Sequence, residues 1–286
     1  MSNLVVRFLI IGCFLLQAAL VDAAGPTSKL CQAPCSSNGN WELSVGLGLG
    51  LSTNPLKGGS DIPLLVRPKL SYYGERFFLD NLEAGFTLWE NPSQQINLLV
   101  LPSLEQLYFR RWQYAASRLP LHPDFSGGDG PTTAEPQPAT PKLHYRHTSA
   151  LSGFEYTFSQ QGFEFNFQLL DEISGYHSGR EMRLAVSRDF LDHWRISFGA
   201  NFQSRDYINY YYGVYSQEAT QTLPVYLADR GGWSKLVRVE YLKPINQHFA
   251  LKASSAIKVF SSEIAASPLM EESRVYSIFL GGVYYF

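Results

Sequence analysis

The stretch Val275–Phe286 reads V-Y-S-I-F-L-G-G-V-Y-Y-F. Alternate residues, counted back from Phe286, form an apolar face with aromatic side chains at both ends: Tyr284, Gly282, Leu280, Ile278 and Tyr276. The residues between them form a smaller and more mixed face. Two such faces are typical of the closing strand of a β-barrel in the bacterial outer membrane, because lipid covers one face and the lumen the other.

The composition of the chain agrees with an exported barrel. Of its 286 residues 14% are aromatic, the formal net charge is -2 and the mean hydropathy is -0.12. No long apolar run follows the first 24 residues. This excludes helical membrane spans, since those need about 20 mostly apolar residues in a row. The near-balanced charge gives no indication of a nucleic-acid partner.

The first 24 residues have the pattern of a secretory signal peptide. One charge, Arg7, precedes an apolar run that is shorter than the ~20 residues needed to span a bilayer. We therefore expect cleavage after Ala23 or Ala24, with an N-terminal anchor helix as the alternative. The expected organisation is a signal peptide at 1–24, a periplasmic segment at 25–40 and an outer-membrane barrel at 41–286.

Two cysteines remain after the signal peptide, Cys31 and Cys35, in a C-x3-C arrangement. In an oxidising periplasm this pair is expected to close a small disulfide loop. A free or metal-bound pair is the alternative, but a metal site needs more ligands than these two. We expect no metal and no cofactor.

Hydrophobic residues alternate with polar ones along most of the chain, which predicts strands with two different faces. Eleven strands are expected at 41–51, 62–73, 76–89, 95–109, 146–159, 162–174, 180–190, 193–208, 232–243, 248–260 and 273–286. Single-chain bacterial barrels have an even number of strands. The Gly- and Pro-rich stretch Gly127–Pro141 is expected to be an extracellular loop, which requires one more strand near Arg111–Leu119. The prediction is an all-β, antiparallel barrel of twelve strands, with ten as the alternative that region 95–145 decides.

The connections between these strands are short at one end and long at the other. Turn-like connectors lie at 73–76, 159–162, 191–193 and 245–248, and longer polar ones at 52–61, 175–179, 207–232 and 261–272. In outer-membrane barrels the short turns are periplasmic and the long loops extracellular.

The charges expected to point into the lumen have both signs: Glu155, Glu164, Arg183, Asp189, Arg195, Arg205, Arg238, Glu240, Lys252 and Lys258. A wide pore selective for one sign is therefore not indicated. A barrel of about twelve strands is narrow enough for side chains and an inserted loop to fill much of it.

One pair of residues has the chemistry of a lipid deacylase. His147 and Ser149 share a strand face, and a serine beside a histidine can act as a nucleophile. The pair lacks a fixed hydrogen bond and an acidic neighbour, so we expect a polar strand end rather than a catalytic site. His144 and His147 point to opposite faces of a strand, and His177–Ser178 is a weaker candidate. No catalytic residue is predicted, and we expect the protein not to be an enzyme.

The run Tyr210–Ala219 reads Y-Y-Y-G-V-Y-S-Q-E-A. It resembles the signature of the MipA/OmpV family of outer-membrane proteins, and the resemblance extends over nearly the whole mature chain. The residues that carry it are Tyr210, Tyr211, Tyr212, Gly213, Ser216, Glu218, Leu223 and Tyr226. Two departures concern loop details: Leu56 stands where an aromatic is expected, and one residue is inserted at Tyr215.

The resemblance implies an outer-membrane barrel that acts as a scaffold for a lytic transglycosylase and a bifunctional murein synthase. A narrow porin-like channel is the alternative, and a lipid-modifying barrel enzyme a third possibility. The expected partners are outer-membrane lipid, these periplasmic murein enzymes and the barrel-assembly machinery. For that machinery the aromatic residues Tyr284 and Phe286 would form the assembly signal.

The tyrosine run Tyr207–Tyr215 has two interpretations. Aromatic rings can stack on sugars, which would indicate a ligand site. We favour an aromatic girdle together with a loop that packs over the barrel mouth, in which alternate tyrosines face lipid at the outer interface.

Overall fold

The computed structural model describes residues 39, 41–103, 105, 108–109 and 144–286. The predicted signal peptide, the pair Cys31 and Cys35, and the strand expected near Arg111–Leu119 lie outside the described residues.

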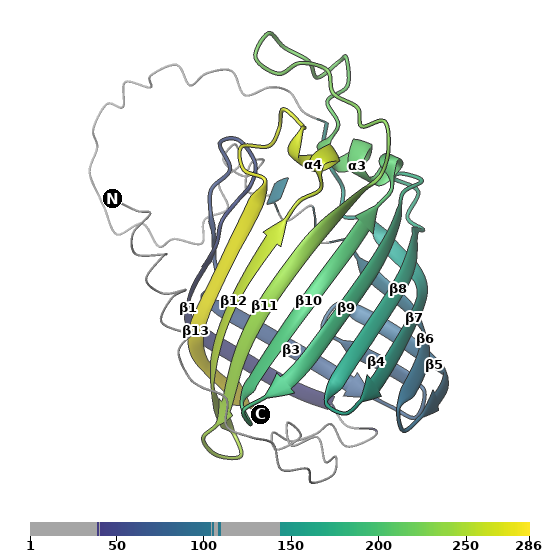
Figure 1. The fold of residues 1–286 in the computed structure, drawn as a ribbon. Coiled ribbons are helices and arrows are strands. Elements are labelled where there is room, and N and C mark those ends of the chain that lie inside the picture. Colours follow the sequence, from purple (N-terminus) through teal and green to yellow (C-terminus); the bar gives the residue numbers. More distant parts are fainter. Residues whose placement is uncertain (1–38, 40, 104, 106–107, 110–143) are drawn as a thin grey trace, which may run out of the picture.

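Thirteen strands form one antiparallel sheet that closes on itself (Figure 1). They are β1 (Trp41–Ser52), β2 (Ile62–Pro63), β3 (Val66–Tyr73), β4 (Phe77–Asp80), β5 (Glu83–Asn91), β6 (Gln94–Pro102), β7 (Ala150–Gln160), β8 (Phe163–Glu172), β9 (Arg180–Phe190), β10 (Trp194–Gln203), β11 (Gly232–Pro244), β12 (Phe249–Val259) and β13 (Arg274–Tyr285). The two-residue β2 pairs only with β1, next to β3. The wall is thus a barrel of twelve strands with one short extra strand, which confirms the predicted fold class.

The barrel closes where β13 pairs with β1, from Ser44 opposite Tyr285 to Ser52 opposite Ser277. The lipid-facing row of β13 follows the predicted alternation, since Tyr284 and Phe286 are 46% and 73% exposed. Whether these aromatics also act as an assembly signal stays a prediction. Gly48 lies opposite Gly281, and a Cβ atom on Gly48 would be only 2.3 Å from the carbonyl oxygen of Leu280. The two glycines let the first and last strands approach closely.

The strand predicted at 76–89 is two strands, β4 and β5, joined by a turn at Asn81 and Leu82. Asn81 adopts a positive φ of 56°, which asparagine tolerates better than most residues. This division supplies the twelfth strand of the barrel. The neighbouring prediction of a strand at 95–109 is also too long, because β6 ends at Pro102.

The strand predicted at 193–208 ends at Gln203, and the chain continues as helix α3 (Arg205–Tyr212). Ser204 caps this helix, its hydroxyl oxygen accepting a hydrogen bond from the N–H of Tyr207 at 3.4 Å. A serine cap and an acidic residue in the first turn stabilise a helix start. Arg205 was predicted to face the lumen; this is wrong, because it lies in the first turn of α3 and is largely exposed.

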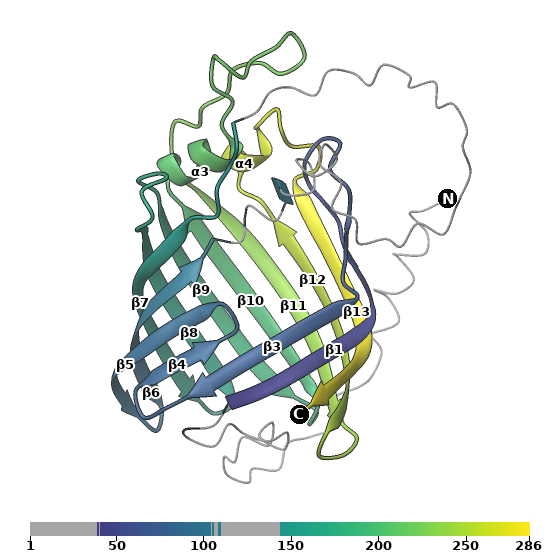
Figure 2. The same ribbon diagram turned by 180° about the vertical axis from the view of Figure 1, so that it is seen from behind.

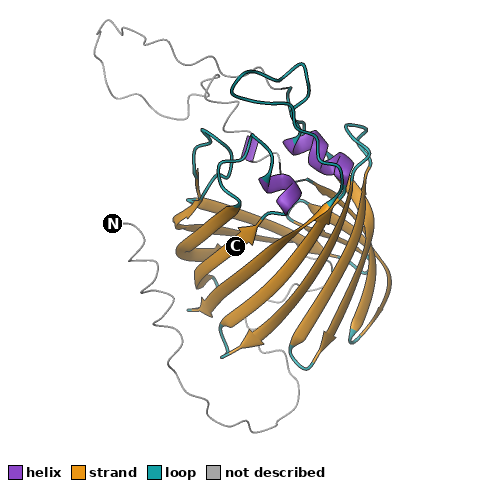
Figure 3. Ribbon diagram, turned by 45° about the horizontal axis from the view of Figure 1, so that its top comes forward, coloured by secondary structure: helices purple, strands orange, loops and turns teal. Residues whose placement is uncertain are grey.

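Apart from the tight turn between β4 and β5, the connections follow the predicted asymmetry of short turns at one end and long ones at the other. The long connections gather at the end of the barrel that carries α3 and α4 (Ser262–Ala265), as Figures 1 and 3 show. Among the described residues, no helix has the length and apolarity to cross a membrane.

Replacing Gly48 with alanine should destabilise the closure of the barrel. Its methyl group would clash with the backbone of β13, and overpacking of this kind costs roughly 1–3 kcal/mol. Gly46→Ala is the matched control, because a Cβ atom there meets Arg67 at an ordinary 3.5 Å. The measurement is the fraction of refolded protein that migrates as folded barrel in unheated gels. Equal yields for the two variants would contradict the close-approach argument.

Candidate functional site

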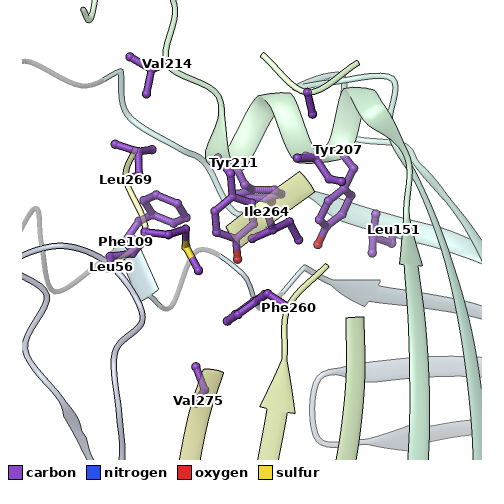
Figure 4. Packing of buried hydrophobic residues seen from close by; sticks show 14 of the residues in the cluster. Leu56, Phe109, Leu151, Tyr207, Tyr211, Val214, Phe260, Ile264, Leu269 and Val275 are labelled. Atoms are coloured by element: carbon purple, nitrogen blue, oxygen red, sulfur yellow. The ribbon is translucent and has the colours of Figure 1, made fainter. Parts of the chain in front are cut away.

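Buried apolar side chains fill the mouth of the barrel at the end with the long connections (Figure 4). We call these residues the cap cluster: Leu56, Phe109, Leu151, Tyr207, Ile208, Tyr211, Tyr212, Val214, Phe260, Ile264, Leu269 and Val275. They come from α3, from the connections beside it and from the ends of the wall strands. The main apolar core of this protein is therefore inside the barrel mouth.

Helix α3 supplies the largest part of the cap cluster. At about 100° per residue, Tyr207, Ile208, Tyr211 and Tyr212 share one helix face, and all four are buried. The prediction that alternate tyrosines of this run face lipid is wrong, because the run is helical and turns inward. The other half of that interpretation, a loop packed over the mouth, agrees with the structure.

The buried tyrosine hydroxyls find hydrogen-bond partners, as burial of a polar group requires. Tyr207 pairs with the hydroxyl of Ser103 at 2.7 Å, and Tyr211 with that of Ser149 at 2.9 Å. Tyr212 donates to the carboxylate of Glu105. The cap is therefore fixed to the ends of the wall by specific polar contacts as well as by apolar packing.

A buried ion pair links the cap to the segment that enters β7. The guanidinium of Arg146 lies 2.7 Å from the carboxylate of Glu218, and their side chains are only 4% and 1% exposed. Glu218 also accepts hydrogen bonds from the N–H groups of His144 and Tyr215, while Arg146 donates to the carbonyl of Gly213. Burial alone would raise the pKa of Glu218, but these donors hold it below its ordinary value. We call this pair the cap clamp.

The residues of the family signature thus hold the cap together. Gly213 ends α3, where a Cβ atom would be 2.3 Å from the carbonyl oxygen of Asn209. Val214 forms an isolated bridge with Tyr226, and Leu223 is buried. Ser216 is exposed.

A second buried ion pair lies below the cap. Glu105 is 2.7 Å from the ammonium of Lys258 and also accepts a hydrogen bond from Gln203. Burial favours a raised pKa for Glu105, yet Lys258, Tyr212 and Gln203 lower it below its usual range. The ring of Phe260 lies 4.6 Å from the same ammonium. Lys258 faces the interior, as predicted.

The lumen wall is lined by charges of both signs, from just below the cap to the far end, as the sequence predicts. Glu181 pairs with Arg183 at 2.9 Å, and Lys252 with Glu240 at 3.3 Å. Arg195 lies between Glu164 and Asp189, at 3.0 and 3.4 Å. This mixed lining carries no excess of one sign.

The predicted pair His147 and Ser149 is separated, and another histidine takes its place. The ring of His147 stacks on Tyr176, with 4.5 Å between ring centroids. His177 instead places Nε2 3.2 Å from the hydroxyl of Ser149. No local pattern indicates this pair, because the two residues lie 28 positions apart on different connections.

The geometry of this pair does not activate the serine. Nδ1 of His177 accepts a hydrogen bond from the N–H of Gly179 at 2.9 Å. The ring proton is therefore on Nε2, which donates a hydrogen bond to the hydroxyl oxygen of Ser149. Burial lowers the pKa of His177, which favours the neutral ring. A general base needs a free lone pair facing the nucleophile and a group that orients it from behind. Among the described residues, no cluster of three metal-binding side chains occurs either.

An open cavity of about 500 Å³ lies on the extracellular side of α3. Aromatic and charged side chains line it, among them Tyr176, His177, Arg205, Asp206, Tyr210 and Asp229. Arg205 and Asp206 pair with each other at 3.2 Å, and Asp229 adds a further negative charge to the lining.

A closed barrel with two-faced strands and a capped mouth defines an outer-membrane β-barrel protein. The chain belongs to the MipA family, because the family of the MltA-interacting protein MipA matches residues 45–286. The putative outer membrane protein YiaT of Escherichia coli is 21% identical over 84% of this chain and 89% of its own length. The outer membrane protein OmpV of Vibrio cholerae is 30% identical over 43% of this chain and 47% of its own. These relatives agree with the predicted family and with the outer membrane as location.

Solved barrels are similar only in outline. OccAB3 of Acinetobacter baumannii matches with a TM-score of 0.38 and 8% identity, over 82% of this chain and 59% of its own. LpxR of Salmonella typhimurium matches with a TM-score of 0.37 and 10% identity, over 86% of this chain and 99% of its own.

Removing one partner of the cap clamp should loosen the cap. Arg146→Met leaves the Glu218 carboxylate buried without its cation, and a broken buried pair costs about 3–5 kcal/mol. The expected result is rapid protease cleavage within 213–230 in folded barrels, measured by mass spectrometry. The double variant Arg146→Met with Glu218→Leu should restore much of the resistance, since it removes both charges. Equal cleavage of the single variant and the unaltered protein would contradict the clamp.

The same clamp predicts a dependence on pH. The folded-state pKa of Glu218 is lowered, so its contribution is complete above the ordinary glutamate pKa of about 4.3 and is lost as the pH falls through the lowered value. Protease resistance of the cap, measured with pepsin, should fall across that acidic range. In Glu218→Gln the step should disappear.

Proposed function

We propose that this protein is an interaction barrel that presents peptidoglycan-remodelling enzymes, a lytic transglycosylase and a murein synthase, to one another at the outer membrane. The observation that carries the proposal is the cap cluster. Tyr211, Tyr212 and Ile264 are fully buried in the mouth, and a closely packed plug of this kind is a poor path for polar solutes. A barrel closed in this way is suited to anchoring and binding rather than to diffusion.

The family description supports a periplasmic partner. It designates a protein that interacts with MltA, and we transfer that class of partner to this chain as a proposal. The short turns, such as Ser159–Gly162 and Leu191–His193, would present the surface on the periplasmic side. The extracellular cap would then serve to keep the barrel shut.

Binding and conductance together test this function. The protein in nanodiscs should bind a purified lytic transglycosylase and murein synthase at once, and in planar bilayers it should give no steady single-channel steps. A chain lacking residues 28–40 is the matched variant and should bind less while it still folds. Steady conductance steps without any capture of either enzyme would favour the narrow channel and contradict the scaffold.

We also propose that the barrel does not modify lipids. Ser149 is buried, and its hydroxyl oxygen accepts a hydrogen bond from Nε2–H of His177. Ser149→Ala should cost about 1 kcal/mol of stability through the lost hydrogen bonds to Tyr211 and His177. Lipid extracted from cells that express either form should have the same acyl composition by mass spectrometry. Acyl loss that depends on Ser149 would contradict this.

A further inference from the structure

The wall of the barrel has a gap in its strand pairing between β3 and β6 (Figure 2). The hairpin of β4 and β5 turns at Asn81 and Leu82, so β4 covers β3 only along Ser71–Tyr73. On the other flank the pairing of β5 with β6 ends at Val100. We call the region bounded by Val66–Leu70, the Asn81–Leu82 turn and Val100–Pro102 the notch.

Each edge of the notch has a proline, which has no backbone N–H, at a position that faces the notch. Two bonds show which residues of β3 direct their backbone N–H and C=O groups away from β1. They run from Gly48 N–H to the carbonyl of Leu65 and from Asn81 N–H to that of Leu70. By the alternation of an antiparallel ladder these residues are Leu70, position 68 and Val66, and position 68 is a proline. On β6 the bond from Ser103 N–H to the carbonyl of Ser149 places position 102 in the same situation, and it too is a proline.

These prolines bear on what can occupy the notch. A strand of another protein would need donors and acceptors along both edges, and edge prolines prevent such pairing. Among the described residues no strand pairs with Val66 on this side. A hydrocarbon chain forms no hydrogen bonds, so the missing donors at positions 68 and 102 do not matter to it.

The notch opens at the level of lipid. Val66 pairs with Leu47 and Leu70 with Leu43, both in the lipid-facing row of β1. The apolar side chains around the opening are exposed, at 39–66%: Val66, Leu70, Leu82 and Val100. Acyl chains of the membrane therefore contact the opening directly.

Two basic side chains of β3 lie on the lumen side of the notch. Arg67 and Lys69 point inward, opposite the lumen-facing Gly46 and Ser44 of β1. The side chain of Lys69 is 49% exposed, whereas that of the lumen-facing Glu181 is 3% exposed. The inner face of β3 is therefore less covered at Lys69 than the wall is at Glu181.

Arg67 is the cation available to a ligand. Lys69 pairs with Asp80 at 3.3 Å, whereas Arg67 forms no ion pair within the described part of the chain. Its guanidinium lies 5.2 Å from the ring centroid of Phe279, on the lumen side. A guanidinium binds a single carboxylate through two parallel hydrogen bonds. The carboxylate of Asp80, which pairs with Lys69 on the same face of the sheet, disfavours headgroups that carry several negative charges.

We propose that the notch is a lateral binding site for a long-chain fatty acid, with the acyl chain between β3 and β6 and the carboxylate on Arg67. It connects the bilayer with the lumen below the cap, so lipid-derived molecules would reach the interior although the mouth is closed. The site is independent of the proposed capture of murein enzymes.

Oleate binding to the folded protein in dodecyl maltoside, measured by calorimetry, tests the site. Arg67→Glu should weaken binding by about tenfold or more, since it replaces a charge-assisted contact by a repulsion. Arg238→Glu is the matched control. Arg238 is also exposed and faces the lumen from β11. Its replacement by glutamate changes the charge by the same amount. Equal affinities of the two variants for oleate would overturn the proposal.

A second pair of variants tests the notch itself. Val66→Trp fills the opening and should abolish oleate binding, whereas Leu47→Trp, on the paired residue of β1, should leave it unchanged. Both positions face lipid, where tryptophan is tolerated, so both variants should fold. Phosphatidylglycerol that binds at Arg67 more tightly than oleate does would refute the single-chain ligand. Unchanged oleate binding by Val66→Trp would refute the lateral site.

Discussion

The backbone hydrogen bonds between β1 and β13 are the constraint on which the rest of this structure depends. Hydrocarbon offers no partner to an N–H or a C=O group, so a sheet crosses a membrane only if its two edges pair. Here the edges pair from Ser44–Tyr285 to Ser52–Ser277, with Gly48 and Gly281 at the closest approach. Closure gives every strand a lipid face and a lumen face, and it defines the mouth that the cap fills.

A mouth of this size can be filled by one short helix and a few loop residues. The tyrosines of α3 suit this task, since each carries a large ring and a hydroxyl that can bond to the rim. Ser103, Ser149 and Glu105 are the hydrogen-bond partners of those hydroxyls, while the clamp of Arg146 and Glu218 fixes the neighbouring loop. The cap is thus a small apolar core inside a membrane barrel. The proposed fatty-acid site at the notch between β3 and β6 would connect lipid with the lumen below this closed top.

Most strands can be predicted from the sequence because one face of each meets lipid and the other the lumen. The prediction is wrong where a turn or a helix begins without a glycine or proline to mark it. Along 76–89 the outward residues shift from odd positions, Phe77 and Leu79, to even ones, Ala84 and Phe86. That change of phase marks the turn at Asn81. After Ser204 the apolar spacing changes from two to four, which marks α3. The contacts of Glu218 with Arg146 and of His177 with Ser149 join distant segments, so no local pattern could predict them.

Hydrogen–deuterium exchange of the folded protein in nanodiscs tests the capped barrel most directly. The account predicts that the amides of Ile208 to Gly213 in and after α3 exchange as slowly as those of β9 and β10, because both belong to one packed unit. Exchange of these amides as fast as that of the exposed residues Thr220 to Thr222 would contradict the cap and the closed mouth.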